Sequence, residues 1–279
     1  MSELQGKRAL ITGASGGIGA AIARDLAARG VDLVLTARGK AALDEVAAAC
    51  AAHGIRVDVI AADLGLPSAG HPLWAAATAS GPIDICVNNA GFGYFRPFAD
   101  IEWARDAELL QLNVTSLVEL SKLFVQARQG DPDRAYLLNI ASIAAYQAVP
   151  NMAVYAASKA FVQAFTEALH DELAGTPISV TCVCPGGTHT NFHAAAGAGN
   201  YGWLANTSML TAEACARASV HAMERGRRTL VTGGLNKLST FGVRLVPRRF
   251  ASWMARRVLG LPRAGALPTR APAPREAAR

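Results

Sequence analysis

Two side chains that could exchange a proton stand four residues apart in the segment Tyr155-Ala156-Ala157-Ser158-Lys159. In an α-helix such residues lie only about 40° apart around the axis, so the phenol and the ammonium would rise side by side from one face. A nearby cation lowers the pKa of a tyrosine from about 10 towards the working pH, which makes the phenol a usable general acid or base. The pair alone is equally compatible with an amphipathic surface helix.

A serine follows an apolar run in the segment Asn139-Ile140-Ala141-Ser142. If that run is a strand of an open α/β sheet, Ser142 lies at the carboxyl edge, where such sheets bind ligands. Its hydroxyl could there hold a substrate carbonyl oxygen towards Tyr155. A serine in this place is also typical of a helix or turn cap, and the residue alone does not decide between the two roles.

A glycine-rich turn extends from Thr12 to Gly19 after the first apolar run. Glycines let the backbone approach a pyrophosphate, and the following helix would direct free N–H groups and its positive dipole end at the negative charge. The spacing Gly-x-x-x-Gly-x-Gly differs from the Gly-x-Gly-x-x-Gly fingerprint, and a plain tight turn is the alternative. Its place at the start of a doubly wound pattern favours nucleotide binding.

The end of the second apolar run indicates which dinucleotide would bind. An acid there accepts hydrogen bonds from a free ribose 2′-hydroxyl, whereas an arginine pairs with a 2′-phosphate. The segment Leu35-Thr36-Ala37-Arg38 offers an arginine and no acid, which favours NADP(H). The alternative is that Arg38 only faces solvent.

The elements that must position these residues alternate between short apolar runs and longer helical patterns, which predicts an α/β, doubly wound (Rossmann-type) parallel sheet of seven strands with helices on both faces. The runs show no polar alternation, as expected for strands covered on both sides. The predicted strands are 8–12, 31–36, 56–61, 83–87, 135–140, 178–184 and 229–232. The predicted helices are 18–29, 40–53, 102–129, 152–174 and 211–225.

The composition is that of a globular protein, because 51% of the 279 residues are hydrophobic and 17% are charged. No apolar run reaches the roughly 18 residues of a membrane-spanning helix, and the first residues lack the pattern of a secretory signal, so we expect a cytoplasmic protein. The five cysteines are scattered and are interpreted as buried free thiols. His189 and His193 lack further ligands at zinc spacing, and no metal site is expected.

The positive charge is concentrated at the C-terminal end. Residues 1–224 have 14 Lys or Arg against 20 Asp or Glu, whereas residues 225–279 have 13 basic residues and one acid. The main domain therefore gives little reason to expect nucleic-acid binding.

Residues 235–246 and 248–261 are predicted to form two helices broken at Pro247. We accordingly expect a catalytic domain over 1–234, a basic amphipathic extension over 235–261 and a disordered tail over 262–279. Three roles for the extension are left open: plain packing on the body, a lid over the site, and contact with a membrane surface, for which a basic amphipathic helix is suited. Segment 191–210 carries several aromatic residues, including Phe192, Tyr201 and Trp203, and a large, mostly apolar pocket would follow if their rings point inward.

Taken together, these motifs make the chain resemble the short-chain dehydrogenase/reductase family over about 7–233. The resemblance rests on the glycine-rich turn, Asp63, Asn88-Asn89-Ala90-Gly91, Asn113, Ser142, Tyr155, Lys159 and Pro185-Gly186. It implies a catalytic tetrad of Asn113, Ser142, Tyr155 and Lys159, in which Asn113 positions a water that links Lys159 to solvent. The cofactor-binding residues that it implies, together with Arg38, are Gly13, Ser15, Gly17, Ile18, Gly19, Asp63, Leu64, Asn89, Ala90, Gly91, Tyr155, Lys159, Pro185, Gly186, Thr188 and Thr190.

The implied activity is hydride transfer between NADP(H) and a ketone, an aldehyde or a secondary alcohol, with Tyr155 moving the proton. Two features depart from the family pattern: Ser15 is not basic, and the segment from Gly187 to Thr190 is polar. Relatives commonly dimerise through the helices predicted at 102–129 and 152–174, which makes a homo-oligomer an open expectation. The alternative function is an NADP(H)-binding sensor or membrane-docking module without turnover.

Overall fold

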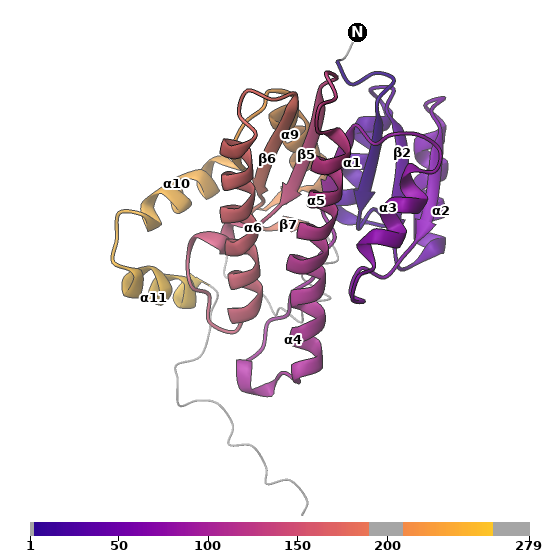
Figure 1. The fold of residues 1–279 in the computed structure, drawn as a ribbon. Helices are drawn as coiled ribbons and strands as arrows, with labels where there is room; N and C mark the ends of the chain where they lie inside the picture. Colours follow the sequence, from indigo (N-terminus) through magenta and orange to yellow (C-terminus); the bar gives the residue numbers. More distant parts are fainter. Residues whose placement is uncertain (1–2, 190–208, 259–279) are drawn as a thin grey trace, which may run out of the picture.

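The computed structural model describes residues 3–189 and 209–258 and contains a parallel sheet of seven strands with helices on both faces (Figure 1). The predicted fold class is confirmed. The strand order is β3-β2-β1-β4-β5-β6-β9, so the chain changes direction across the sheet between β1 and β4, where open α/β folds form their ligand crevice. The strands are β1 (Arg8–Thr12), β2 (Asp32–Ala37), β3 (Val57–Ala61), β4 (Ile85–Asn88), β5 (Ala135–Ile140), β6 (Ile178–Cys184) and β9 (Thr229–Val231).

Each face of the sheet has its own set of helices. Helices α1 (Gly17–Ala27), α2 (Lys40–Ala51) and α9 (Ala212–Glu224) cover one face, and α3 (Gly70–Thr78), α5 (Ser116–Arg128) and α6 (Ala153–Glu172) cover the other. Successive strand residues point to opposite faces, so Ile11 packs in the first core and Leu10 in the second. This double coverage explains why the strands lack polar alternation.

The helix predicted over 102–129 is present at 103–128, but one π-helical turn interrupts its α-helical hydrogen bonding, which the sequence did not predict. The segment consists of α4 (Trp103–Leu110), one π-helical turn (Gln111–Thr115) and α5. The hydrophobic periodicity of the sequence cannot reveal a π-helical turn, because the turn is a single wider helical turn between two segments of ordinary α-helical period. Turns of this kind are frequent at functional sites, and this one contains Asn113.

Short elements complete the edge of the sheet at which the strands end. Two 3₁₀ turns, η1 (Phe98–Asp100) and η3 (Ile143–Tyr146), follow β4 and β5, and the two-residue strands β7 (Thr188–His189) and β8 (Leu210–Thr211) pair with each other.

The C-terminal part of the described chain is helical. Helices α10 (Gly234–Val243) and α11 (Arg248–Val258) lie on either side of Pro247, beyond α6 in Figure 1. No helix among the described residues has both the length and the apolar character needed to cross a bilayer.

A buried arginine ties the start of β1 to its neighbours. The Arg8 side chain is 6% exposed, forms an ion pair with Asp58 at 2.7 Å and donates to the carbonyl oxygens of Ala77 and Gly81. The Arg8 backbone N–H also donates to Asp84. These bonds join the start of β1 to β3, to α3 and the residues after it, and to the residue that precedes β4.

All five cysteines are buried free thiols, as predicted, and Cys182 and Cys184 lie on one face of β6 with their sulfur atoms 3.9 Å apart. The described residues contain no group of three His, Cys, Asp or Glu side chains arranged to hold a metal.

Candidate active site

The glycine-rich turn connects β1 to α1 and is tightly packed at Gly13 and Gly19. Gly13 and Gly17 have φ angles of +65° and +55°, a region that disfavours other residues. A Cβ atom at Gly19 would lie 2.4 Å from the carbonyl oxygen of Gly13. Gly19 therefore allows α1 to begin directly against the turn, and it does not itself line the cavity described below.

The turn is fastened to the end of β4. The Asn89 side-chain amide donates to the carbonyl oxygens of Thr12 and Gly13 at 2.9 and 3.2 Å. The Thr12 hydroxyl in turn accepts from the backbone N–H groups of Asn89 and Ala90. Asn89 and Ala90 thus hold the shape of the turn.

The residues predicted for the adenosine end lie together beyond β2 and β3. Arg38, Asp63 and Leu64 all line the cavity. The Arg38 side chain is 65% exposed, and its Nη1 atom lies 3.4 Å from Oε1 of Glu108 on α4. The Asp63 carboxylate accepts from the backbone N–H of Gly65 at 2.9 Å.

Tyr155 and Lys159 share one face of α6, as their spacing predicted. The ammonium of Lys159 lies 6.0 Å from the centroid of the Tyr155 ring and donates to the carbonyl oxygen of Ile140 at 2.8 Å. Both side chains are buried, and the Tyr155 ring is pressed against Gly93. Burial away from water disfavours the charged amine and lowers the pKa of Lys159 to about 8.

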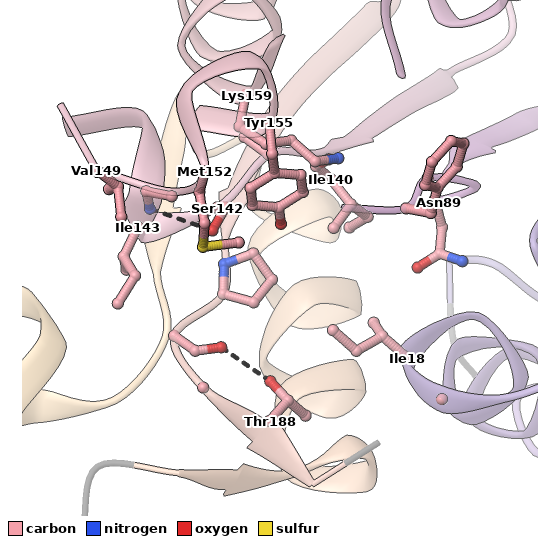
Figure 2. A pocket seen from close by; sticks show the side chains of 18 of the residues that line it. Ile18, Asn89, Ile140, Ser142, Ile143, Val149, Met152, Tyr155, Lys159 and Thr188 are labelled. Atoms are coloured by element: carbon pink, nitrogen blue, oxygen red, sulfur yellow. Dashed lines mark hydrogen bonds between the residues drawn. The ribbon is translucent and has the colours of Figure 1, made fainter. Parts of the chain in front are cut away.

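Ser142 is a cap, one of the two roles that its sequence position left open, and it also lies at the cavity. It ends the loop after β5, caps η3 by accepting from the backbone N–H of Ala144 at 3.1 Å, and lines the cavity with Tyr155. Figure 2 shows this capping bond beside the Tyr155 ring. Because the hydroxyl acts as an acceptor in the cap, its own proton can still be directed at a ligand.

Asn113 lies fully buried in the π-helical turn, behind the cavity wall. Its amide donates to the carbonyl oxygen of Phe92 and to the Ser158 hydroxyl, and its Oδ1 accepts from the Phe92 N–H. A Cβ atom at Gly91 would lie 2.9 Å from Asn113 Oδ1 and 3.3 Å from Lys159 Nζ, so both groups face the same glycine.

The loop after β6 forms the far wall, with Pro185, Gly186 and Thr188 at the cavity. The Thr188 hydroxyl donates to the carbonyl oxygen of Gly186 at 3.1 Å (Figure 2). Asn236 of α10 packs directly on this loop, since a Cβ atom at Gly186 would lie 2.0 Å from its amide nitrogen. Thr190, the remaining predicted residue of this loop, lies outside the described residues, as do Phe192, His193, Tyr201 and Trp203.

These parts enclose one cavity of about 1200 Å³ that runs from Arg38 to the loop after β6. A lid over the site is one of the three roles left open for the extension, and residues of α10 and α11 do line this cavity. The sequence did not indicate Asn236 or which apolar residues of the extension reach the wall, because that depends on where these two helices lie. The wall residues near Tyr155 and on the two C-terminal helices are Ile143, Val149, Met152, Leu235, Leu238, Val243, Val246, Phe250, Ala251 and Met254.

Comparison with known proteins agrees with this geometry. The family model described as short chain dehydrogenase matches residues 7–200. The chain belongs to the short-chain dehydrogenase family. Over 187 residues it is 34% identical to the ketoacyl reductase HetN of Nostoc sp., an alignment that covers 67% of this chain and 65% of that protein.

Solved structures of short-chain dehydrogenases superpose on most of the chain. The enzyme of Sphingobium yanoikuyae in complex with NADPH is 28% identical and matches with a TM-score of 0.76, covering 86% of this chain and 94% of that one. A short-chain dehydrogenase/reductase of Burkholderia phymatum in complex with NAD is 25% identical and matches with a TM-score of 0.77 over the same shares. Family relatives of this fold are therefore found with either dinucleotide.

Proposed function

We propose that this short-chain dehydrogenase is an NADP(H)-dependent oxidoreductase that transfers hydride between nicotinamide and a ketone, an aldehyde or a secondary alcohol. One observation carries the proposal: the cavity that begins at the glycine-rich turn reaches Tyr155, which has the buried Lys159 beside its ring. The ketoacyl reductase and the NADPH-bound structure among the relatives support this reaction class.

The described residues fit a dinucleotide, because glycines form the cavity floor at the start of α1 and leave space for a pyrophosphate beside free N–H groups. When bound, the cofactor supplies or accepts the hydride. Gly19 would act by packing, and Thr190 stays a prediction. The described residues proposed to hold the cofactor are Gly13, Ser15, Gly17, Ile18, Arg38, Asp63, Leu64, Asn89, Ala90, Gly91, Tyr155, Lys159, Pro185, Gly186 and Thr188.

The proton is assigned to Tyr155. During reduction its hydroxyl would donate to the substrate oxygen, while the Ser142 hydroxyl donates a second hydrogen bond that fixes the same oxygen. Below pH about 8, Lys159 is an ammonium that stabilises the phenolate left behind. Asn113 holds the loop after β4 against α6, and its role in ordering a water beside Lys159 stays a prediction.

Two features of the cavity support finer proposals about its ligands. Arg38 at the adenosine end would pair with a 2′-phosphate, which favours NADP(H) over NAD(H). The apolar wall built from η3, α6, α10 and α11 would fit a bulky lipophilic substrate.

The activity is tested by mixing the purified protein with NADPH and a panel of lipophilic carbonyl compounds and following the loss of NADPH absorbance. Tyr155→Phe should abolish this loss but keep NADPH binding, whereas Tyr146→Phe, which removes a phenol outside the cavity lining, should remain active. Equal turnover by Tyr155→Phe would refute the assigned proton transfer. Arg38→Asp should weaken NADPH more than NADH, and an unchanged ratio would remove the cofactor argument.

We also propose that residues 1–234 form the catalytic unit, which holds the reacting groups, and that the extension over 235–261, besides forming part of the cavity wall, contacts anionic membranes. Residues 234–258 contain six basic residues and no acid. Contact between such a surface and anionic lipid combines apolar burial with charge attraction. The extension also has apolar side chains that are 41–71% exposed, namely Leu235, Leu238, Phe241, Leu245, Phe250, Trp253 and Met254.

Flotation with vesicles tests the membrane contact separately from catalysis. The protein should float with vesicles that contain phosphatidylserine and less with neutral ones, and Phe241→Ser should reduce flotation. Phe98→Ser is the matched control, since Phe98 is similarly exposed, at 66% against 61%, but lies outside the extension. Equal flotation of both variants would refute this role. A module that binds NADP(H) without turnover is less well supported, because all four tetrad residues are present.

A further inference from the structure

Glu108 stands between two arginines at the adenosine end of the cavity. One carboxylate oxygen lies 3.4 Å from Nη1 of Arg38, and the other forms an ion pair with Arg105 one turn earlier on α4. The guanidinium of Arg105 lies 4.1 Å above the centroid of the Phe92 ring, which anchors it. Glu108 therefore has a partner of its own whether or not Arg38 stays beside it.

The charges around Arg38 allow it to pair either with Glu108 or with a bound anionic ligand. The Glu108 side chain is 30% exposed, while that of Arg38 is 65% exposed and so can turn towards a ligand at little cost. Glu108 also approaches Asp63: a Cβ atom at Gly65 would lie 3.0 Å from Asp63 Oδ1 and 3.3 Å from Glu108 Cγ. A phosphate that pairs with Arg38 would therefore have Asp63 at the same cavity wall and the Glu108 carboxylate beside the guanidinium.

Resting on the proposed use of NADP(H), we infer that Glu108 determines how strongly the site discriminates NADPH from NADH, by competing with the 2′-phosphate for Arg38. The 2′-phosphate is repelled by the Glu108 carboxylate and must take over the guanidinium with which Glu108 pairs. NADH has a hydroxyl at that position and experiences neither effect. Solvent exposure screens these charges, which limits the expected effect to a small factor in affinity.

The test is direct binding of NADPH and NADH, followed by dinucleotide fluorescence, to the wild-type chain and to Glu108→Gln. The variant should bind NADPH about three- to tenfold more tightly and NADH within a factor of two of wild type. Added salt should shrink the gain. The gain should also shrink when Arg38→Gln is present, because the contested guanidinium is then absent.

Glu172→Gln is the matched control, since it removes the same charge from the exposed C-terminal end of α6, on a different helix from the Arg38–Glu108 ion pair. An unchanged NADPH-to-NADH ratio in Glu108→Gln would overturn the inference, and so would weaker NADPH binding, which would mean that Glu108 only holds Arg38 in position. Those results leave the proposed function standing. If the wild-type chain bound neither dinucleotide, the proposed function would fail, and this inference with it.

Discussion

Replacing Lys159 by methionine should change how the stability of the cofactor-free protein depends on pH. Lys159 is 4% exposed, and its pKa in the folded state is lowered to about 8 by loss of hydration. In the unfolded chain a lysine titrates near 10.4. Between these two values the unfolded state holds a proton that the folded state has released, so stability rises with pH in this window.

The size of this effect follows from the two pKa values. Each pH unit of full difference in proton binding is worth about 1.4 kcal/mol, and linkage between pH 7.5 and 9.5 gives about 2 kcal/mol after allowing for partial titration at both ends. The free energy of unfolding of wild type, minus that of Lys159→Met, should therefore increase by about 2 kcal/mol over that range. Taking the difference removes the contribution of tyrosines and cysteines that titrate in the same range.

Urea unfolding at several pH values between 7.5 and 9.5 measures this difference. Absolute stabilities are not the relevant quantity, because the variant also loses the hydrogen bond to the Ile140 carbonyl. Lys122→Met is the control: it removes an exposed lysine from α5 and should not reproduce the slope. A wild-type minus Lys159→Met difference that stays flat or falls with pH would refute the argument that burial determines the charge of Lys159.

Three further changes test other contacts of the fold and the site. Gly19→Ala should lower the free energy of unfolding of the cofactor-free protein by about 2 kcal/mol, because the added Cβ would meet the backbone of the turn. Gly16→Ala is the control, since the space there is open, and it should cost less than about 0.5 kcal/mol. Equal losses for the two variants in urea unfolding would contradict the packing role of Gly19. Arg8→Met should lower the free energy of unfolding by about 3 kcal/mol or more, because it leaves the Asp58 carboxylate and two carbonyl groups without their partner. A decrease below about 1 kcal/mol in the same assay would show that the ion pair is dispensable. Ser142→Ala should reduce kcat with a carbonyl substrate by at least tenfold. It should lower the free energy of unfolding by only about 1 kcal/mol, which is what the loss of a capping hydrogen bond typically costs. An unchanged kcat would show that Ser142 acts as a cap alone.

The central strands could be predicted because their signal is local. The bounds of β1, β5 and β6 match the predicted ranges, since each is a short, mostly apolar run that packs against both helical layers. Helix α3 was missed because what begins it is distant in sequence. The backbone N–H groups of Gly70 and His71 donate to the carboxylate of Glu119 on α5, so no capping residue precedes the helix.

The site residues likewise divide into those placed by local sequence and those placed by contacts with residues distant in sequence. The pairing of Tyr155 with Lys159 follows from helix geometry alone, and it was predicted. The burial of Asn113 depends on bonds to Phe92 and Ser158, 21 and 45 residues away, which no periodicity encodes. Asn236 meets Gly186 only because α10 folds back across the loop after β6, and the sequence between them has no motif that indicates this approach.

The part of the outer cavity wall that α10 and α11 form is encoded after the last strand of the sheet, which has a consequence for protein engineering. Exchanging α10 and α11 for those of another family member would alter the shape of the substrate-binding end while the reacting groups, held by the sheet and α6, keep their places. Asn236 limits where such a graft could be joined. A chimera that retained this asparagine and changed only the residues after it would preserve the surroundings of Gly186, so substrate preference could diversify through the end of the chain while the chemistry stays the same.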